Sequence, residues 1–203
     1  MVRVDTVVFD VGNVLIRWDP RHLYSRIFSD AAAMERFLGE ICTDAWNLEQ
    51  DRGRPWAEAI AERIALFPQH EALIRAYSER WHEMVPGEVE GSVPLLERLR
   101  SAGVPLYAIT NFSAEKFAEA QERFPFLRRF RDVVVSAHER LLKPDPAIYR
   151  LLLDRNGLEA GRCLFIDDSE RNVLGAEAVG MRAHHFRDAK GLSSALRAVG
   201  LPG

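Results

Sequence analysis

Five short apolar segments, separated by segments with helical periodicity, constrain the fold of this chain most strongly. They are VDTVVFD (4–10), VPLYAITN (104–111), DVVVSA (132–137), RCLFIDD (162–168) and, with a weaker signal, RAHHF (182–186). Their apolar residues follow one another with few interruptions, as in parallel strands that are covered by helices on both faces. The alternation of strand and helix predicts an α/β fold with a doubly wound, Rossmann-like parallel sheet.

Capping residues and glycines mark the ends of the helices between these strands. Asp145 is a typical N-terminal cap before Pro146, and Gly157 is a typical stop after the last turn. In SVPLLERLRSAG, Ser92 is the expected cap and Gly103 the expected stop. These signals predict helices at the places where an alternating α/β fold requires them.

The region from residue 20 to about residue 85 interrupts this alternation. Helical patterns cover about 20–28, 30–41, 56–66 and 69–84, and no strand signal lies among them. We therefore predict a helical cap domain of residues 17–86, inserted into an α/β core formed by residues 1–16 and 87–203. An insertion after the first strand lies over the carboxyl ends of the strands, where open α/β sheets bind ligands.

Composition argues against several classes of partner. The net charge is -3, and the arginines are interspersed with acidic residues, so we expect no nucleic-acid partner. The N-terminal apolar run is too short for a signal peptide, and no stretch approaches the length of a membrane span. Cys42 and Cys163 lie in apolar surroundings, which is typical of reduced thiols. We expect a cytoplasmic protein without a membrane partner, either a monomer or a homodimer.

Chemically useful side chains stand where the predicted strands end. In chain order they are Asp10, Thr110, Asn111, Lys143, Asp167 and Asp168. Because the carboxyl ends of parallel strands meet at one edge of a sheet, we expect these side chains to converge there.

Each of these groups has a role if the substrate is a phosphate monoester. Asp10 can attack phosphorus and form an acyl phosphate, which water then hydrolyses. The carboxylates of Asp10, Asp167 and Asp168, with the backbone carbonyl of Gly12, are hard oxygen ligands that suit Mg²⁺. Such a metal offsets the repulsion between an anionic nucleophile and an anionic phosphate.

The remaining polar residues fit the same interpretation. Thr110 and the backbone of Asn111 can donate to phosphoryl oxygens, and Lys143 adds a positive charge that also keeps the carboxylates ionised. The helix that begins near Ser113 directs its N-terminal dipole toward the same place. Asn172 can brace the acidic pair as a hydrogen-bond donor, although a capping role or plain exposure to solvent fits the sequence nearly as well.

Four segments resemble the motifs of the haloacid dehalogenase-like (HAD) hydrolases, in the same order and with similar spacing. They are FDVGNV, ITN, LKPDPAIY and FIDDSERN. The resemblance covers essentially the whole chain and includes a helical cap after the first motif, as in the helical-cap (C1) branch. FDVGNV is similar to a group that includes bacterial sugar-1-phosphate phosphatases. The resemblance implies a Mg²⁺-dependent phosphatase of small phosphorylated metabolites that uses Asp10 as nucleophile.

Gly12 departs from the pattern of most phosphatases in this family, which carry a second aspartate two residues after the nucleophile. That aspartate protonates the leaving oxygen and later activates water. Three hypotheses stay open. In the first, the chain is a phosphatase of substrates with a good leaving group, such as a sugar 1-phosphate. In the second, it is a 2-haloacid dehalogenase-type hydrolase that uses Asp10 without metal. In the third, it is a non-catalytic phosphate-binding member of the family. A dehalogenase would also need a cap arginine for the substrate carboxylate, and the candidates are Arg17, Arg21 and Arg52.

The segment WNLEQDRGRPW (46–56) is the part of the cap that we expect to select the substrate. Trp46, Glu49 and Arg52 are its candidates for contact with a sugar or an acid. The alternative is that Trp46 and Trp56 only pack the cap helices together.

Overall fold

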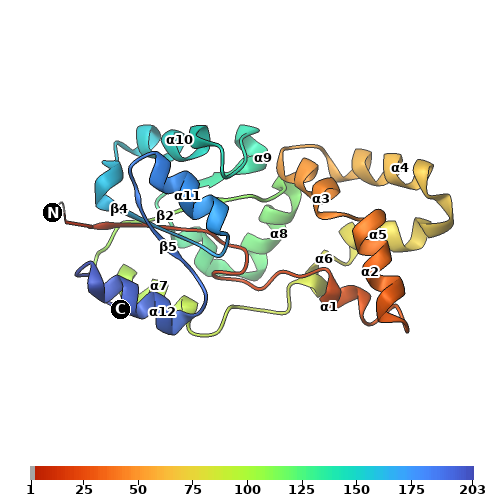
Figure 1. Ribbon diagram of the computed structural model, residues 1–203, viewed down its shortest axis with the longest axis horizontal. Helices are drawn as coiled ribbons and strands as arrows, with labels where there is room; N and C mark the ends of the chain where they lie inside the picture. The colour runs from red at the N-terminus through yellow and green to blue at the C-terminus, as the bar shows by residue number, and fades with distance from the viewer. Residues whose placement is uncertain (1–2) are drawn as a thin grey trace.

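The computed structural model describes residues 3–203 and contains one five-stranded parallel sheet (Figure 1). The strands are β1 (Thr6–Phe9), β2 (Leu106–Thr110), β3 (Val133–Val135), β4 (Cys163–Asp167) and β5 (Arg182–His185). Their order is β3-β2-β1-β4-β5, with β1 in the centre. In its register, Val7 pairs with Leu106 on one side and with Leu164 on the other. The sheet confirms the predicted α/β class.

Helices cover both faces of the sheet, as Figure 1 shows. The helices α10 (Pro146–Asn156) and α11 (Glu170–Ala178) lie on one face, and α7 (Ser92–Ser101) and α12 (Ala189–Ala198) lie on the other. Successive residues of a strand point to opposite faces. Val8 accordingly packs in the cluster of α10, whereas Val7 and Phe9 pack in the cluster of α7 and α12. This burial on both faces explains the nearly continuous apolar strands.

The remaining elements lie between the strands in the chain. Helix α8 (Ala114–Arg123) and the 3-10 helix η2 (Pro125–Arg129) follow β2. The single turn α9 (Ser136–Glu139) follows β3, and η3 (Ala160–Arg162) precedes β4.

The helices between β1 and α7 gather at one end of the molecule, beyond the carboxyl ends of the strands (Figure 1). They are α1 (Arg21–Tyr24), α2 (Ala31–Glu40), α3 (Asp44–Asp51), α4 (Trp56–Leu66), η1 (Pro68–His70), α5 (Glu71–Glu79) and α6 (Trp81–Met84). The two chain segments that join them to the sheet pair with each other, since Arg17 N donates to the Gly87 carbonyl over 2.9 Å. The proposed domain boundaries, 17 and 86, lie beside this pair.

Three local predictions needed correction. Helix α3 was not predicted, although Thr43 caps it by accepting from Trp46 N over 3.1 Å. The helix expected over 69–84 is interrupted at Arg80, whose backbone dihedral angles are not those of an α-helix. Gly91, not Ser92, is the residue that precedes α7. Gly91 has a φ of 78°, and a Cβ there would lie 2.8 Å from Ala189 Cβ, so the position requires glycine.

Other local features agree with the sequence. Asp145 caps α10 by accepting from Ala147 N over 2.9 Å, and Gly157 ends it with a φ of 61°. Cys42 and Cys163 are buried and form no disulfide. Within residues 3–203, every helix is too short or too polar to span a bilayer.

Candidate active site

A buried lysine joins two aspartates at the carboxyl edge of the sheet. Asp10 directly follows β1, and Asp167 is the last residue of β4. Lys143 comes from the loop before α10, and its Nζ lies 2.7 Å from Asp10 Oδ1 and 2.7 Å from Asp167 Oδ2. Thr110, at the end of β2, is also buried. Four of the candidate residues are therefore brought to one place by three different strands and a loop.

Asn111 holds the loop of Lys143 in position. Its side-chain Oδ1 accepts from Lys143 N over 2.8 Å, and its Nδ2 donates to the Lys143 carbonyl over 3.1 Å. The prediction for Asn111 concerned only its backbone, as a donor to phosphate. The structure adds a positioning role for the side chain.

Asp167 has its carboxylate oxygens occupied by protein donors. Oδ1 accepts from Ser169 N over 2.9 Å and from Asn172 Nδ2 over 3.0 Å, while Oδ2 accepts from Lys143. Asn172 is itself fixed, because the Tyr149 hydroxyl donates to its backbone carbonyl over 2.8 Å. A buried carboxylate with this many donors stays fixed in place.

Burial and neighbouring charges both shift the pKa values of these groups. Burial raises the pKa of Asp10 to about 7, although the neighbouring Lys143 ammonium opposes the shift. Burial also raises the pKa of Asp168, and the charge of Asp167 adds to this effect. Burial lowers the pKa of Lys143, but the two carboxylates outweigh it and bring the pKa above its ordinary value. Lys143 is therefore an ammonium at neutral pH.

Three carboxylates lie close enough together to hold one cation. Asp10, Asp167 and Asp168 each place an oxygen within 4.8 Å of the others. Such a set of carboxylate oxygens, without histidine or cysteine, fits Mg²⁺. Because Asp167 is occupied by other donors, Asp10 and Asp168 have more oxygen lone pairs available for a metal. The ligation by these residues and by the Gly12 carbonyl stays a prediction.

A cavity of about 100 Å³ opens beside Gly12, between the sheet edge and the helical region. It is lined by Gly12, Trp18, Asn47, Asp51, Trp56, Trp81, Asn111, Phe112, Ser113 and Lys116. A Cβ at Gly12 would meet nothing within 4 Å, so the missing side chain leaves open space there. Four aromatic rings make the cavity largely apolar.

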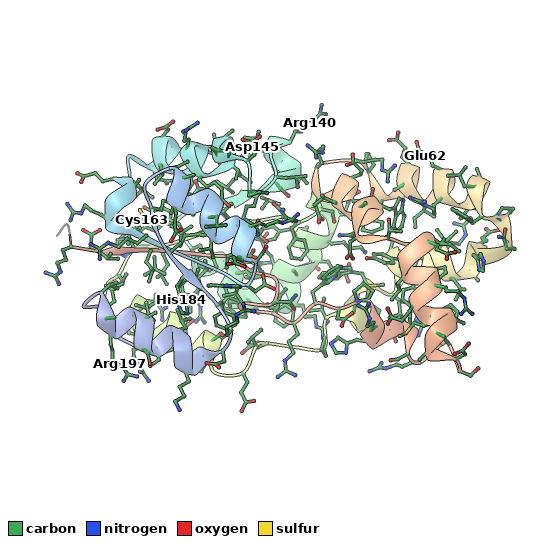
Figure 2. All side chains as sticks on the ribbon, in the orientation of Figure 1. Glu62, Arg140, Asp145, Cys163, His184 and Arg197 are labelled. Atoms are coloured by element: carbon green, nitrogen blue, oxygen red, sulfur yellow. The ribbon has the colours of Figure 1, made fainter. Side chains whose placement is uncertain are left out.

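The three cap candidates lie outside the lining of this cavity. Trp46 is buried, and its ring packs edge-on against Trp56 at 5.6 Å between centroids. Glu49 and Arg52 are exposed, pair with each other over 3.7 Å, and line a separate depression with Arg140, which is labelled in Figure 2.

Two serines that sequence analysis did not single out as contacts connect the helical region to the sheet. Ser136 Oγ donates to the Asp51 carbonyl over 2.5 Å and accepts from Phe112 N over 2.9 Å. Ser113 Oγ accepts from Trp56 Nε1 over 2.8 Å. These contacts join α3 and the start of α4 to the loop that follows β2.

A protein-family model covers most of the chain. A model described as haloacid dehalogenase-like hydrolase matches residues 4–180. The chain belongs to this family. The resemblance drawn from the four motifs is confirmed, and the chain is a HAD-like hydrolase.

Relatives of this HAD-like hydrolase include several proteins that are named as phosphatases or as a nucleotidase. The sesquiterpene phosphatase astK of Aspergillus oryzae is 28% identical over 94% of this chain and 93% of its own length. The fructose-1-phosphate phosphatase YqaB of Escherichia coli is 31% identical over 89% of this chain and 95% of its own. The 5'-nucleotidase of Pseudomonas aeruginosa is 29% identical over 89% of this chain and 81% of its own length.

Solved structures show the same fold. The HAD family enzyme BT-2542 of Bacteroides thetaiotaomicron superposes with a TM-score of 0.76 at 20% identity, covering 97% of this chain and all of the other. Its magnesium complex superposes with a TM-score of 0.75 at 18% identity over the same shares of both chains.

Proposed function

We propose that this chain is a Mg²⁺-dependent phosphatase of small phosphorylated metabolites that forms an aspartyl phosphate on Asp10. The observation that carries the proposal is the contact of Lys143 with both Asp10 and Asp167, beside a third carboxylate on Asp168. A nucleophilic carboxylate, a fixed ammonium and a set of cation ligands are the groups that phosphoryl transfer requires.

The hydrogen bonds of Asp10 favour one of its oxygens as nucleophile. Oδ1 accepts from Val11 N over 2.7 Å and contacts Lys143 over 2.7 Å. Oδ2 is then the oxygen available to form a bond to phosphorus, while the bond from phosphorus to the leaving oxygen breaks. Water next attacks phosphorus, the Asp10–phosphorus bond breaks, and inorganic phosphate leaves. Bound Mg²⁺ supplies positive charge that reduces the repulsion between carboxylate and phosphate.

Thr110, the backbone of Asn111 and Lys143 are proposed to bind the phosphoryl oxygens. Thr110 is almost completely buried, so a hydrogen bond from its hydroxyl competes little with water. The ammonium of Lys143 places positive charge where the transferring group carries negative charge.

The aromatic cavity is proposed to bind the part of the substrate that leaves. The lining includes the aromatic side chains of Trp18, Trp56, Trp81 and Phe112. Aromatic rings can pack against the C–H groups of a sugar or against an apolar chain. The apolar lining suits the C–H groups of a sugar 1-phosphate, the substrate class expected from FDVGNV, and it also suits the apolar chain of an isoprenoid phosphate. The relatives named for fructose 1-phosphate and for sesquiterpenes support testing both classes.

The lining of the cavity gives less support to the dehalogenase hypothesis. Among the described residues that form the lining, none is an arginine, and Lys116 pairs with Glu119 over 2.9 Å. Arg21 is held by both oxygens of Glu35. The lining therefore offers a substrate carboxylate no arginine, and a metal-independent reaction would leave the cluster of carboxylates without a cation to bind.

The test is phosphate release from a panel of sugar 1-phosphates, isoprenoid phosphates and simple alkyl phosphates, with Mg²⁺ and with EDTA. We expect turnover with Mg²⁺ only, and a loss of at least about 1,000-fold in Asp10→Asn, which removes the nucleophile. Asp44→Asn, an exposed aspartate on α3, is the matched control and should retain activity. An inactive wild type, or turnover that survives Asp10→Asn, would contradict the proposal. Metal-independent halide release from 2-halo acids would favour the dehalogenase.

A further inference from the structure

Asp51 is the carboxyl group among the residues that line the cavity beside Gly12. We propose that Asp51, from the cap helix α3, is the general acid and base that replaces the aspartate missing at position 12. The inference rests on the proposed phosphatase function, because it assigns a residue to one step of that reaction.

The reaction needs a proton donor beside the leaving oxygen. An alkoxide leaves slowly unless a proton reaches it as the bond to phosphorus breaks. Gly12 has no side chain to give one, and the space around its Cα is open toward the cavity. A donor on another wall of the same cavity can occupy that role.

The position of Asp51 is fixed by contacts with both the cap and the core. Its backbone carbonyl accepts from Ser136 Oγ over 2.5 Å, and Ser136 Oγ also accepts from Phe112 N. Its carboxylate Oδ2 accepts from Asn47 Nδ2, one helical turn earlier, over 3.2 Å. Phe112 lies two residues after Thr110, the proposed phosphate ligand. Asp51 is thus held beside the loop that carries the phosphate-binding groups.

The surroundings of Asp51 favour its protonated form. Burial raises the pKa of Asp51 to about 7, although a hydrogen bond with the backbone of Ser113 opposes the shift. A carboxyl group with a pKa near the working pH can both give and take a proton. Asn47 can remain a partner in both states, because its amide donates to the carboxylate and its oxygen accepts from the acid.

Charged groups on the neighbouring elements have partners elsewhere. On α8, the Glu115 carboxylate accepts from Trp56 N over 3.1 Å, and Lys116 pairs with Glu119. On α9, Glu139 pairs with Arg155 over 2.5 Å, and His138 is exposed to solvent. These contacts leave Asp51 as the carboxyl group in position to exchange protons with a molecule in the cavity.

The proton balance closes over one catalytic cycle. As the bond from phosphorus to the leaving oxygen breaks, the carboxyl proton of Asp51 moves to that oxygen and the product leaves as an alcohol. The Asp51 carboxylate then takes a proton from the water whose oxygen attacks phosphorus. Phosphate departs from Asp10, and Asp51 is protonated again.

The experiment compares Asp51→Asn with wild type on two substrates, a simple alkyl phosphate and p-nitrophenyl phosphate. A p-nitrophenolate leaving group needs little help from an acid, so kcat/KM for p-nitrophenyl phosphate should fall less than about 5-fold in the variant. In contrast, kcat/KM for the alkyl ester should fall at least about 100-fold. With p-nitrophenyl phosphate the variant should show a burst of one p-nitrophenolate per enzyme, because water activation is then slow. Wild-type kcat/KM for the alkyl ester should decrease above pH 7, and the variant should lack this decrease.

Controls separate this role from a structural one. Asp44→Asn makes the same chemical change at an exposed position of α3 and should stay within 2-fold of wild type on both substrates. If Asp51→Asn does not fold, Asp51→Ala with added formate replaces it, and formate should restore turnover of the alkyl ester. The inference would be overturned if Asp51→Asn lowered kcat/KM equally for both substrates or for neither. It would also be overturned if formate had no effect on Asp51→Ala. A wild type inactive on both substrates would instead contradict the proposed function itself.

Discussion

The Nζ atom of Lys143 lies 2.7 Å from Oδ1 of Asp10. The same atom contacts Asp167, so one buried cation faces two buried carboxylates. With Asp168 nearby, the cluster holds more negative than positive charge when all groups are ionised. The excess negative charge favours a divalent cation, and it adds to burial, the larger cause, in raising the pKa values of Asp10 and Asp168.

Lys143→Met tests this charge balance. Removal of the ammonium leaves two buried carboxylates without their cation, which should lower the free energy of unfolding by about 3 kcal/mol at pH 8. The loss should shrink toward pH 5, where the carboxylates take up protons. Urea unfolding at both pH values measures it, and Lys190→Met, at an exposed lysine, is the control. A loss independent of pH would show that packing, not charge, dominates at this position. Phosphate release should fall at least about 100-fold, since a fixed positive charge is lost.

Ser136→Ala tests the connection between α3 and the sheet. The change removes the hydroxyl that contacts both the Asp51 carbonyl and Phe112 N. Buried polar groups without a partner cost stability, so we expect unfolding to become easier by about 1–2 kcal/mol. Turnover of alkyl phosphates should also fall, because Asp51 loses its anchor. Ser194→Ala, on the distant helix α12, should change neither quantity. Unchanged stability in Ser136→Ala would contradict the anchoring role.

The core of the fold and the site residues at the carboxyl ends of the strands were predictable because their sequence signals are local. Apolar strands buried on both faces are visible in the sequence. Polar groups stand at the carboxyl ends of two of them, since Asp10 directly follows β1 and Asp167 is the last residue of β4. The cap side of the site was not predictable in this way. Helix α3 was missed, so the side of the helix on which Asp51 lies was unknown.

The spacing within α3 explains which cap residues reach the cavity. Asn47 and Asp51 are four residues apart and share one side, which faces the cavity. Trp46 points into the helical region, and Glu49 and Arg52 point outward. These directions depend on where the helix begins and on contacts with residues about 60 to 85 positions later, such as Ser113 and Ser136. Such contacts leave no pattern in a short stretch of sequence.

The pH dependence of stability provides a test of Asp51 that does not need a substrate. Its pKa is about 7 in the folded chain and 3.8 is the ordinary value, so between these pH values the folded chain binds more protons than the unfolded one. The contribution of Asp51 to the free energy of unfolding of the wild type is therefore lost as the pH rises from about 4 to about 7. Asp51→Asn has no group there that titrates, so it does not share this loss. The variant should gain about 1–2 kcal/mol relative to wild type between pH 5 and pH 8, less than the full shift because Asp51 keeps some contact with solvent. Urea unfolding at pH 5 and at pH 8 measures the free energy of unfolding of both proteins. The difference between Asp44→Asn and wild type should not change between these pH values.

Gly12→Asp, alone and combined with Asp51→Asn, distinguishes a missing acid from a relocated one. Nothing lies within 4 Å of a Cβ at Gly12, and its φ is not positive, so aspartate fits the backbone. If the chain simply lacks an acid, Gly12→Asp in wild type should raise turnover of alkyl phosphates more than of activated esters. If Asp51 supplies the acid, the single change should have an effect of less than about 3-fold, and the same change in Asp51→Asn should restore turnover by at least about 10-fold. Gly12→Asn, which has nearly the same shape without the acid, should restore nothing. Equal recovery with asparagine would show that Gly12 acts through packing, and a large gain in wild type would show that Asp51 is not the acid.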